Sequence, residues 1–282
     1  MSRPLTTVAL LARPQWRGLS DETSLPVDPR IWAAPLQVLE PESIGEDLRS
    51  ETLGFLSRPA STRWAIFTSP ASVTAYEHWV QTTARLTGQP TGPRAGQQPT
   101  PQFDRFAAVG TGTADQMRRA VLQTDSALVV GAGAATADAL ATVHAIADQV
   151  QSEGLAWKDQ CFVIMGGTNN RPTLAEGLAT LGATVMSLPL YSRRDVEWSD
   201  AVWKRLSESP RETAIVVTSS TVVDRLMQSL VTHGIDPVRL TWATHHATIA
   251  AKLVAYGVSP IRRVRLDPPE LSKDLFDYEQ YW

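Results

Sequence analysis

The sequence predicts an α/β protein of two similar lobes, each with a parallel β-sheet that helices cover on both faces. Short apolar runs alternate with segments of helical period, which is typical of buried parallel strands joined by helices. A strand–Thr–Ser–helix unit also occurs twice. The length of 282 residues leaves room for two domains.

Six continuous apolar runs mark the expected strands. They lie at residues 8–11, 64–67, 106–109, 127–130, 162–165 and 214–217. Three helices are expected from apolar residues three or four positions apart. Their buried faces are Val73, Tyr76 and Val80; Leu174, Leu178 and Leu181; and Val223, Leu226, Met227 and Leu230. Residues 87–103 are rich in Pro, Gly, Gln and Thr, so we expect a flexible insert there.

The repeat defines the lobes. Residues 65–69 end in Thr68-Ser69 before a helix, and residues 215–219 end in Thr218-Ser219 in the same way. A second strand–turn–helix follows each copy, at residues 108–114 and 242–250. Two lobes of one design predict a cleft between them.

Composition excludes several classes of protein. A net charge of -3 gives no field for a nucleic acid partner. The single cysteine, Cys161, lies in an apolar run and is interpreted as an inert core thiol. No run suits a signal peptide or a membrane span, so we expect a cytoplasmic protein.

The turns after the strands indicate an anion site. The first N–H groups of a helix at the carboxyl end of a parallel strand attract carboxylate or phosphate. Ser69, Ser219, Thr113 and Thr248 are candidate caps at such turns. The alternative is plain N-capping with no ligand.

Other chemistries are weakly supported. The glycine clusters at 110–115 and 131–136 lack the third small residue of a dinucleotide fingerprint. His245 and His246 are adjacent and have no ligand at metal spacing, so a structural or capping role is favoured over a metal. No nucleophile elbow is present.

A series of motifs runs along most of the chain. It consists of Ala12-Arg13-Pro14, Pro35-Leu36 with Glu40-Pro41, Phe67-Thr68-Ser69-Pro70, Val109-Gly110 with Thr113-Ala114, Gly167 with Arg171, Gly182-Ala183 with Leu190-Tyr191, Thr218-Ser219-Ser220, and His246-Ala247-Thr248. In order and spacing this series resembles the uroporphyrinogen-III synthase family. Departures are Gly166 where the family has Arg, Ala247 where it has Pro, and a polar run at residues 18–29 where it has a helix.

The resemblance implies two flavodoxin-like or Rossmann-like lobes joined by a two-stranded linker. Lobe A would comprise residues 1–38 and 192–282, and lobe B residues 39–191. The resemblance also implies a cyclising lyase that closes hydroxymethylbilane, inverting the terminal pyrrole ring and losing water, in haem biosynthesis. No metal or cofactor is implied, and we expect a monomer.

Site residues follow from the same resemblance. Tyr191 would protonate the departing hydroxyl, or else only anchor the linker. Substrate carboxylates would be bound by Arg13, Thr68, Ser69, Gly110, Thr113, Arg171, Ser219, Ser220, His246 and Thr248, although the two arginines could be simple surface charges. The runner-up is a non-catalytic two-lobed binding or regulatory protein. A nicotinamide-dependent oxidoreductase would need a phosphate loop that the sequence lacks.

Overall fold

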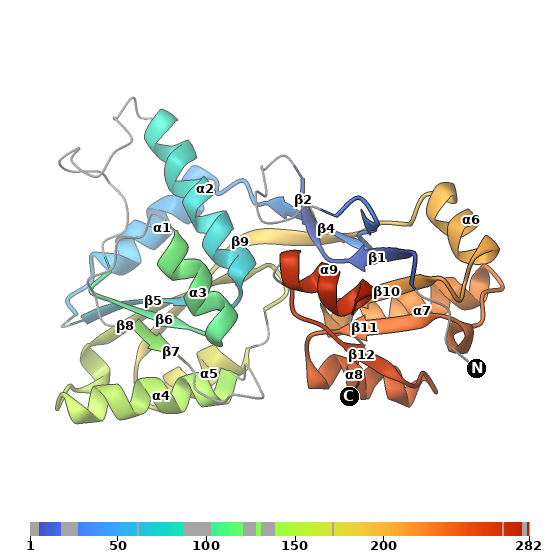
Figure 1. The fold of residues 1–282 in the computed structure, drawn as a ribbon. Helices are drawn as coiled ribbons and strands as arrows, with labels where there is room; N and C mark the ends of the chain where they lie inside the picture. The colour runs from blue at the N-terminus through green and yellow to red at the C-terminus, as the bar shows by residue number, and fades with distance from the viewer. Residues whose placement is uncertain are drawn as a thin grey trace. The chain divides into compact units, whose positions relative to one another are not determined.

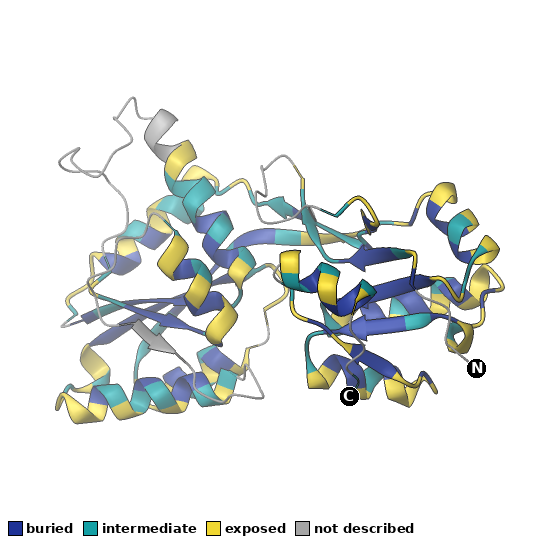
Figure 2. Ribbon diagram, in the orientation of Figure 1, coloured by how far each residue is buried: buried dark blue, intermediate teal, exposed yellow. Residues whose placement is uncertain are grey.

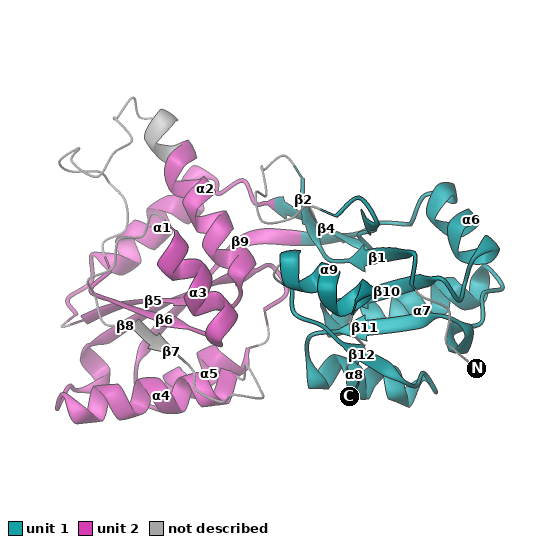
Figure 3. Cartoon of the chain, viewed as in Figure 1, with its two compact units in different colours: residues 1–40, 193–282 teal, residues 41–192 magenta. Residues whose placement is uncertain are grey.

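The computed structural model describes residues 6–17, 28–60, 62–86, 103–120, 128–130, 139–170, 172–266, 268–277 and 281. The chain divides into two compact units (Figure 3). Unit 1 comprises residues 1–40 and 193–282, and unit 2 comprises residues 41–192. The expected insert at residues 87–103 lies outside the described residues except for Phe103, and Arg171 lies outside them too.

Unit 1 is built on a five-stranded parallel sheet in the order β3-β1-β10-β11-β12 (Figure 1). This is the strand order 2-1-3-4-5 of flavodoxin-like sheets. Its elements are β1 (Val8–Ala12), β3 (Ile31–Ala33), α6 (Asp200–Glu208), β10 (Thr213–Val217), η2 (Ser220–Val222), α7 (Val223–Thr232), η3 (Pro237–Arg239), β11 (Thr241–Thr244), α8 (Ala247–Ala255), β12 (Ile261–Arg263) and α9 (Pro268–Phe276).

Unit 2 carries five parallel strands in the order β9-β8-β5-β6-β7 within a larger sheet. Its elements are α1 (Glu46–Leu56), β5 (Thr62–Phe67), α2 (Pro70–Leu86), β6 (Arg105–Ala108), α3 (Thr111–Arg119), β7 (Leu128–Val130), α4 (Ala139–Ser152), η1 (Trp157–Asp159), β8 (Gln160–Gly167), α5 (Thr173–Thr180) and β9 (Thr184–Asp195). The predicted α/β class with parallel sheets is therefore confirmed.

Two strands carry the chain from one unit to the other. They are β4 (Gln37–Pro41) and β9, which are neighbours in the larger sheet, with β2 (Gln15–Trp16) beyond β4. Main-chain hydrogen bonds from Glu42 to Leu190 and from Val196 to Leu36 show that β4 and β9 run in opposite directions. The two crossings of the chain thus share one hydrogen-bonded pair of strands.

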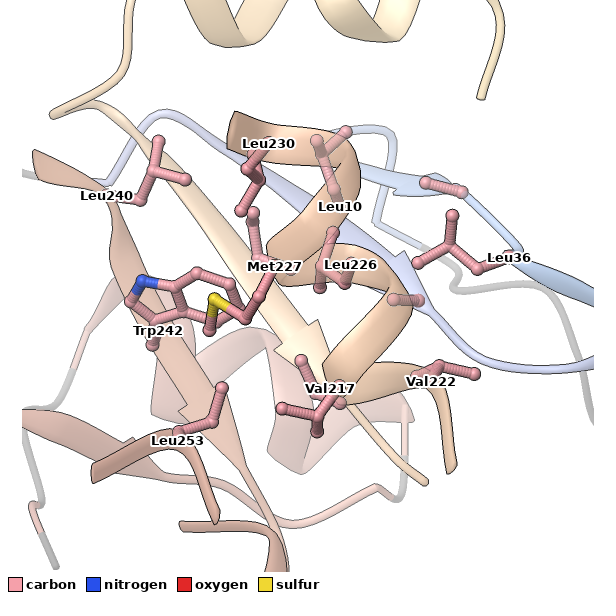
Figure 4. Close-up of a cluster of buried hydrophobic side chains, with 14 of the residues drawn as sticks. Leu10, Leu36, Val217, Val222, Leu226, Met227, Leu230, Leu240, Trp242 and Leu253 are labelled. Carbon is pink, nitrogen blue, oxygen red and sulfur yellow. The ribbon is translucent and has the colours of Figure 1, made fainter. Parts of the chain in front are cut away.

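Both faces of each sheet are covered. In unit 1 one face packs against α6, α7 and α8 around Trp242 and Leu226 (Figure 4), and the other face packs against α9 through Leu271. In unit 2, α4 and α5 cover one face through Ile146 and Leu178. The central strands β1, β5, β8 and β10 are buried along most of their length, and helices expose their outer faces (Figure 2), which explains the continuous apolar runs in these strands.

The expected helix faces are largely correct. The four residues of α7 are all buried, and Val73 and Tyr76 of α2 are buried as well. Two residues are exceptions: Val80 of α2 is only half-buried, and Leu181 is the C-cap of α5 and is 38% exposed. Cys161 is buried in β8, as expected for a core thiol, and burial raises its pKa. No helix within the described ranges is long and apolar enough to cross a membrane.

Gly110 is required by the backbone at the start of α3. It is the N-cap of that helix with φ 87° and ψ 162°, a region that is essentially restricted to glycine. Gly112, two residues later, lies inside the helix, and a Cβ added there would have nothing within 4 Å. The two glycines therefore differ in what they contribute.

We expect Gly110→Ala to destabilise the protein by about 1–3 kcal/mol, because alanine is strained in this region. Gly112→Ala serves as the matched control and should be neutral or stabilising by less than about 1 kcal/mol. Calorimetric melting of both variants measures the difference. Equal melting temperatures for the two would contradict this account of Gly110.

Candidate functional site

Unit 2 has a topological switch point between β5 and β8. These strands are adjacent and parallel, with Phe67 paired to Met165, yet the helices that follow them lie on opposite faces. In open α/β sheets, ligands bind beyond the carboxyl ends of the strands at such a point. The carboxyl edge, meaning the edge where the parallel strands end, is therefore the place to look for a site.

Ser69 joins two elements at this edge. Its hydroxyl oxygen accepts the Ser72 N–H at 3.2 Å, which caps α2, and lies 3.1 Å from the Tyr191 hydroxyl. The Ser72 hydroxyl donates back to the Ser69 carbonyl at 2.7 Å. The structure thus brings together two of the predicted site residues, Ser69 and Tyr191, which are 122 positions apart in the chain.

Tyr191 depends on a glycine for its position. It pairs with Gly167 across β8 and β9, and its side chain is only 1% exposed. A Cβ at Gly167 would lie 3.2 Å from Cε2 and Cζ of the tyrosine ring, tighter than ordinary van der Waals contact. The Thr168 N–H donates to the Tyr191 carbonyl at 2.9 Å and holds the main chain. Glycine at 167 therefore lets the ring pack against the end of β8.

The neighbouring Gly166 is covered by Asn170. A Cβ at Gly166 would lie 1.8 Å from Asn170 Nδ2, so the Asn170 amide occupies the space that a side chain at 166 would need. Asn170 itself is exposed. Sequence reasoning did not select Asn170. The one sequence feature that could have pointed to Asn170 is its position four residues after Gly166, where the resembled family has Arg.

Two threonines in unit 2 donate hydrogen bonds to main-chain carbonyls. The N–H and hydroxyl of Thr68 both donate to the Met165 carbonyl, at 3.1 and 3.2 Å. The Thr113 hydroxyl donates to the Val109 carbonyl at 3.1 Å, and the residue is 2% exposed. The prediction that Thr113 caps α3 is wrong, because Gly110 is the N-cap. The exposed first turn of α3, at Thr111 and Gly112, begins just before Thr113.

In unit 1 the corresponding switch point lies between β1 and β10. Arg13 follows β1 and is half-buried, and Ser219 follows β10. The Ser219 oxygen accepts the Thr221 N–H at 3.4 Å and caps η2, while the Thr221 hydroxyl donates to Gln37 Oε1 at 3.3 Å. Ser219 is therefore a cap, as predicted.

Lys252 of α8 supports the Ser220 turn. Its ammonium group donates to the Ser220 carbonyl at 2.9 Å and to the Asp224 carboxylate at 2.6 Å. Hydrogen bonds from Lys252 and then Tyr256 lower the pKa of Asp224. Lys252 was not among the predicted site residues, because a lone helical lysine gives no sequence signal.

His246 caps α8. Its Nδ1 accepts the Thr248 N–H at 3.2 Å, so Nδ1 carries no proton in this arrangement. The predicted cap at Thr248 is wrong. Thr248 is exposed in the first helical turn and contributes its main-chain N–H to the histidine.

His245 is held in the neutral form. Burial, followed by the charges of His246 and Arg13, lowers its pKa to about 4. Its Nδ1 is buried and has no hydrogen-bond partner in the part of the chain that the structure describes. With His245 neutral, the positive charges at this edge include the Arg13 guanidinium and the Lys252 ammonium group.

A cavity of about 590 Å³ lies elsewhere in unit 1. Glu197 and Trp203 line it, together with Arg225 of α7 and His233, the C-cap of that helix. Since α7 begins at the carboxyl edge and His233 follows its last residue, the cavity extends away from that edge. Within the described ranges, no group of three or more His, Cys, Asp or Glu residues could hold a metal ion.

One protein family and several solved structures match the chain. A family model described as uroporphyrinogen-III synthase HemD matches residues 30–263. The structure is similar to a uroporphyrinogen-III synthetase from Helicobacter pylori, with 11% identity, a TM-score of 0.52 and coverage of 93% of each chain. It also matches a mutant uroporphyrinogen III synthase from Thermus thermophilus, with 16% identity, a TM-score of 0.47 and coverage of 92% of this chain and 94% of that one. No curated protein sequence matches the chain.

We expect His245 to make stability depend on pH. Its folded pKa of about 4 lies below the unfolded value of 6.5, so between these values the unfolded chain binds a proton that the native state does not. Stability should fall as pH drops through this window, by an amount on the order of 3 kcal/mol, and this contribution should vanish above pH 6.5.

The measurement is the free energy of unfolding in urea at several pH values for the parent and His245→Phe. Carboxylates titrate in both proteins. The difference between the two unfolding free energies at each pH therefore reports the contribution of His245 alone. Parallel curves between pH 4 and 6.5 would show that His245 is not kept neutral by the fold.

Proposed function

The chain belongs to the uroporphyrinogen-III synthase family, and on that premise we propose that it cyclises hydroxymethylbilane to uroporphyrinogen III. The observation that carries the proposal is the family match over residues 30–263, which spans both units. The family consists of cyclising lyases of tetrapyrrole biosynthesis. The reaction is a dehydration with rearrangement and changes no oxidation state.

The proposed binding groups are mainly main-chain donors. A linear tetrapyrrole carries acetate and propionate groups, and helix N-termini stabilise such anions. The starts of α2, α3, η2 and α8 lie at the carboxyl edges and bring Ser69, Gly110, Ser219 and His246 there. Arg13 would add one positive charge, and Arg171, outside the described residues, would add another.

The remaining candidates would act in different ways. Thr68 and Thr113 would shape the turns through their bonds to main-chain carbonyls, and Thr248 would offer the exposed first turn of α8. Ser220 would contribute the main chain of its turn, whose carbonyl accepts a hydrogen bond from Lys252. Tyr191 is the proposed source of the proton for the departing hydroxyl, since its own hydroxyl is paired with Ser69 at the edge.

We also propose that the protein acts as a cytoplasmic monomer on this small molecule and not on nucleic acid. The net charge of -3 supports the last point, because it provides no general attraction for a polyanion.

The direct test is product isomer analysis. Freshly made hydroxymethylbilane closes spontaneously to the unrearranged isomer I, so the protein should divert it to isomer III. Chromatographic separation of the two isomers, with and without protein, measures this. An unchanged isomer ratio would refute the catalytic proposal and favour the non-catalytic binding protein.

Two variants should separate chemistry from binding. Tyr191→Phe removes a proton donor and should lower kcat by about 10²–10⁴-fold. Thr248→Ala removes only an exposed side chain, because His246 provides the cap, and should cost less than about tenfold. The rate of isomer III formation measures both. The reverse order would make Tyr191 a structural anchor of β9.

A further inference from the structure

The burial of Tyr191 raises a question of access. Its side chain is 1% exposed, and its ring lies against Gly167 at the end of β8. Ser69, whose hydroxyl is 3.1 Å from the tyrosine hydroxyl, is only half-buried. A molecule at the carboxyl edge therefore meets Ser69 before it meets Tyr191.

The geometry of the pair is fixed from both sides. Ser69 is held by its exchange of hydrogen bonds with Ser72 at the first turn of α2. Tyr191 is held by the Thr168 N–H on its carbonyl and by the close packing of its ring on Gly167. The Ser72 N–H thus holds one hydroxyl, and the main chain at Gly167 holds the ring that carries the other. Two hydroxyls at hydrogen-bond distance can pass a proton along, each donating as it accepts.

We propose that Ser69 and Tyr191 form a proton relay in which the Ser69 hydroxyl, and not that of Tyr191, contacts the departing group of the substrate. The inference rests on the proposed function and refines it. Ser69 is then the catalytic residue, and Tyr191 is a positioning residue that resupplies its proton. Gly167 sets the distance by letting the tyrosine ring approach.

The step balances without any added reagent. As the C–O bond of the hydroxymethyl group breaks, its oxygen keeps the electron pair and takes the Ser69 proton, leaving as water. The Tyr191 proton moves to the serine oxygen in the same event, so no serine alkoxide accumulates. The cationic carbon of the substrate then reacts with the terminal ring. The proton released when the last pyrrole ring regains aromaticity returns through Ser69 to Tyr191.

Ser69 also caps α2, so the test must separate the cap from the relay. Asparagine caps helices as well as serine does but has no hydroxyl proton to pass on. Threonine keeps both the cap and the hydroxyl. Ser152→Ala, an exposed hydroxyl at the far end of α4 in the same unit, is the control and should match the parent.

The experiment measures kcat and KM for isomer III formation. We expect Ser69→Ala and Ser69→Asn to lower kcat at least about a hundredfold with KM within about threefold, while Ser69→Thr stays within about tenfold of the parent. Because the two hydroxyls act as one unit, Ser69→Ala combined with Tyr191→Phe should be no slower than the slower single variant.

Three results would overturn the relay. The first is an Asn variant that retains kcat within about tenfold of the parent, which would leave Ser69 only a cap. The second is a double variant whose losses multiply, which would make the two residues independent. The third is a parent that forms no isomer III, and this alone would remove the proposed function together with the relay.

Discussion

Parallel pairing of the strands is the constraint on which the other features of this molecule depend. A parallel strand must be reached by a connection that returns across the sheet, so the helices that follow strands begin at one edge. In unit 1 the order β3-β1-β10-β11-β12 places the starts of η2 and α8 at that edge. In unit 2 the order β9-β8-β5-β6-β7 does the same for α2 and α3. The two sheets therefore have the same layout: if β10 is placed on β5 and β1 on β8, each strand of unit 1 has a counterpart at the same position in unit 2.

The side chains at these edges mostly organise the backbone, and the proposed binding groups are main-chain N–H groups. Thr68, Thr113 and Lys252 are engaged with carbonyls that end a strand or a turn. His246 accepts an N–H as a cap, and His245 stays neutral beside it. This arrangement suits the recognition of several carboxylates by main-chain N–H groups, with few fixed positive charges. In unit 2 the proposed chemistry depends on one pair of hydroxyls, those of Ser69 and Tyr191.

The sequence predicted those features that depend on local pattern. The continuous apolar runs became β1, β5, β6, β7, β8 and β10. Of these, β1, β5, β6, β8 and β10 are largely buried, and strands buried on both faces need no polar alternation. The Thr-Ser turns led to Ser69 and Ser219, both of which cap. The wrong predictions have a common cause, because a sequence pattern does not fix where a helix begins or ends. Thr113 and Thr248 lie three and two residues after the true N-caps, and Leu181 lies one residue after the end of α5. The contacts of Gly167 with Tyr191 and of Asn170 with Gly166 join residues through tertiary packing, which no spacing reveals.

The central claim is that the carboxyl edges bind the substrate through main-chain N–H groups. Amide chemical shifts in ¹⁵N-labelled protein, followed while uroporphyrinogen III is added as the product ligand, test it most directly. The account predicts saturable shifts at the first turns of α2, α3 and α8 and at the Ser219–Ser220 turn. The amides of Gln160 and Thr213, at the opposite ends of β8 and β10, should stay unchanged. Shifts confined to the opposite edge, or to the cavity beside α7, would contradict the claim.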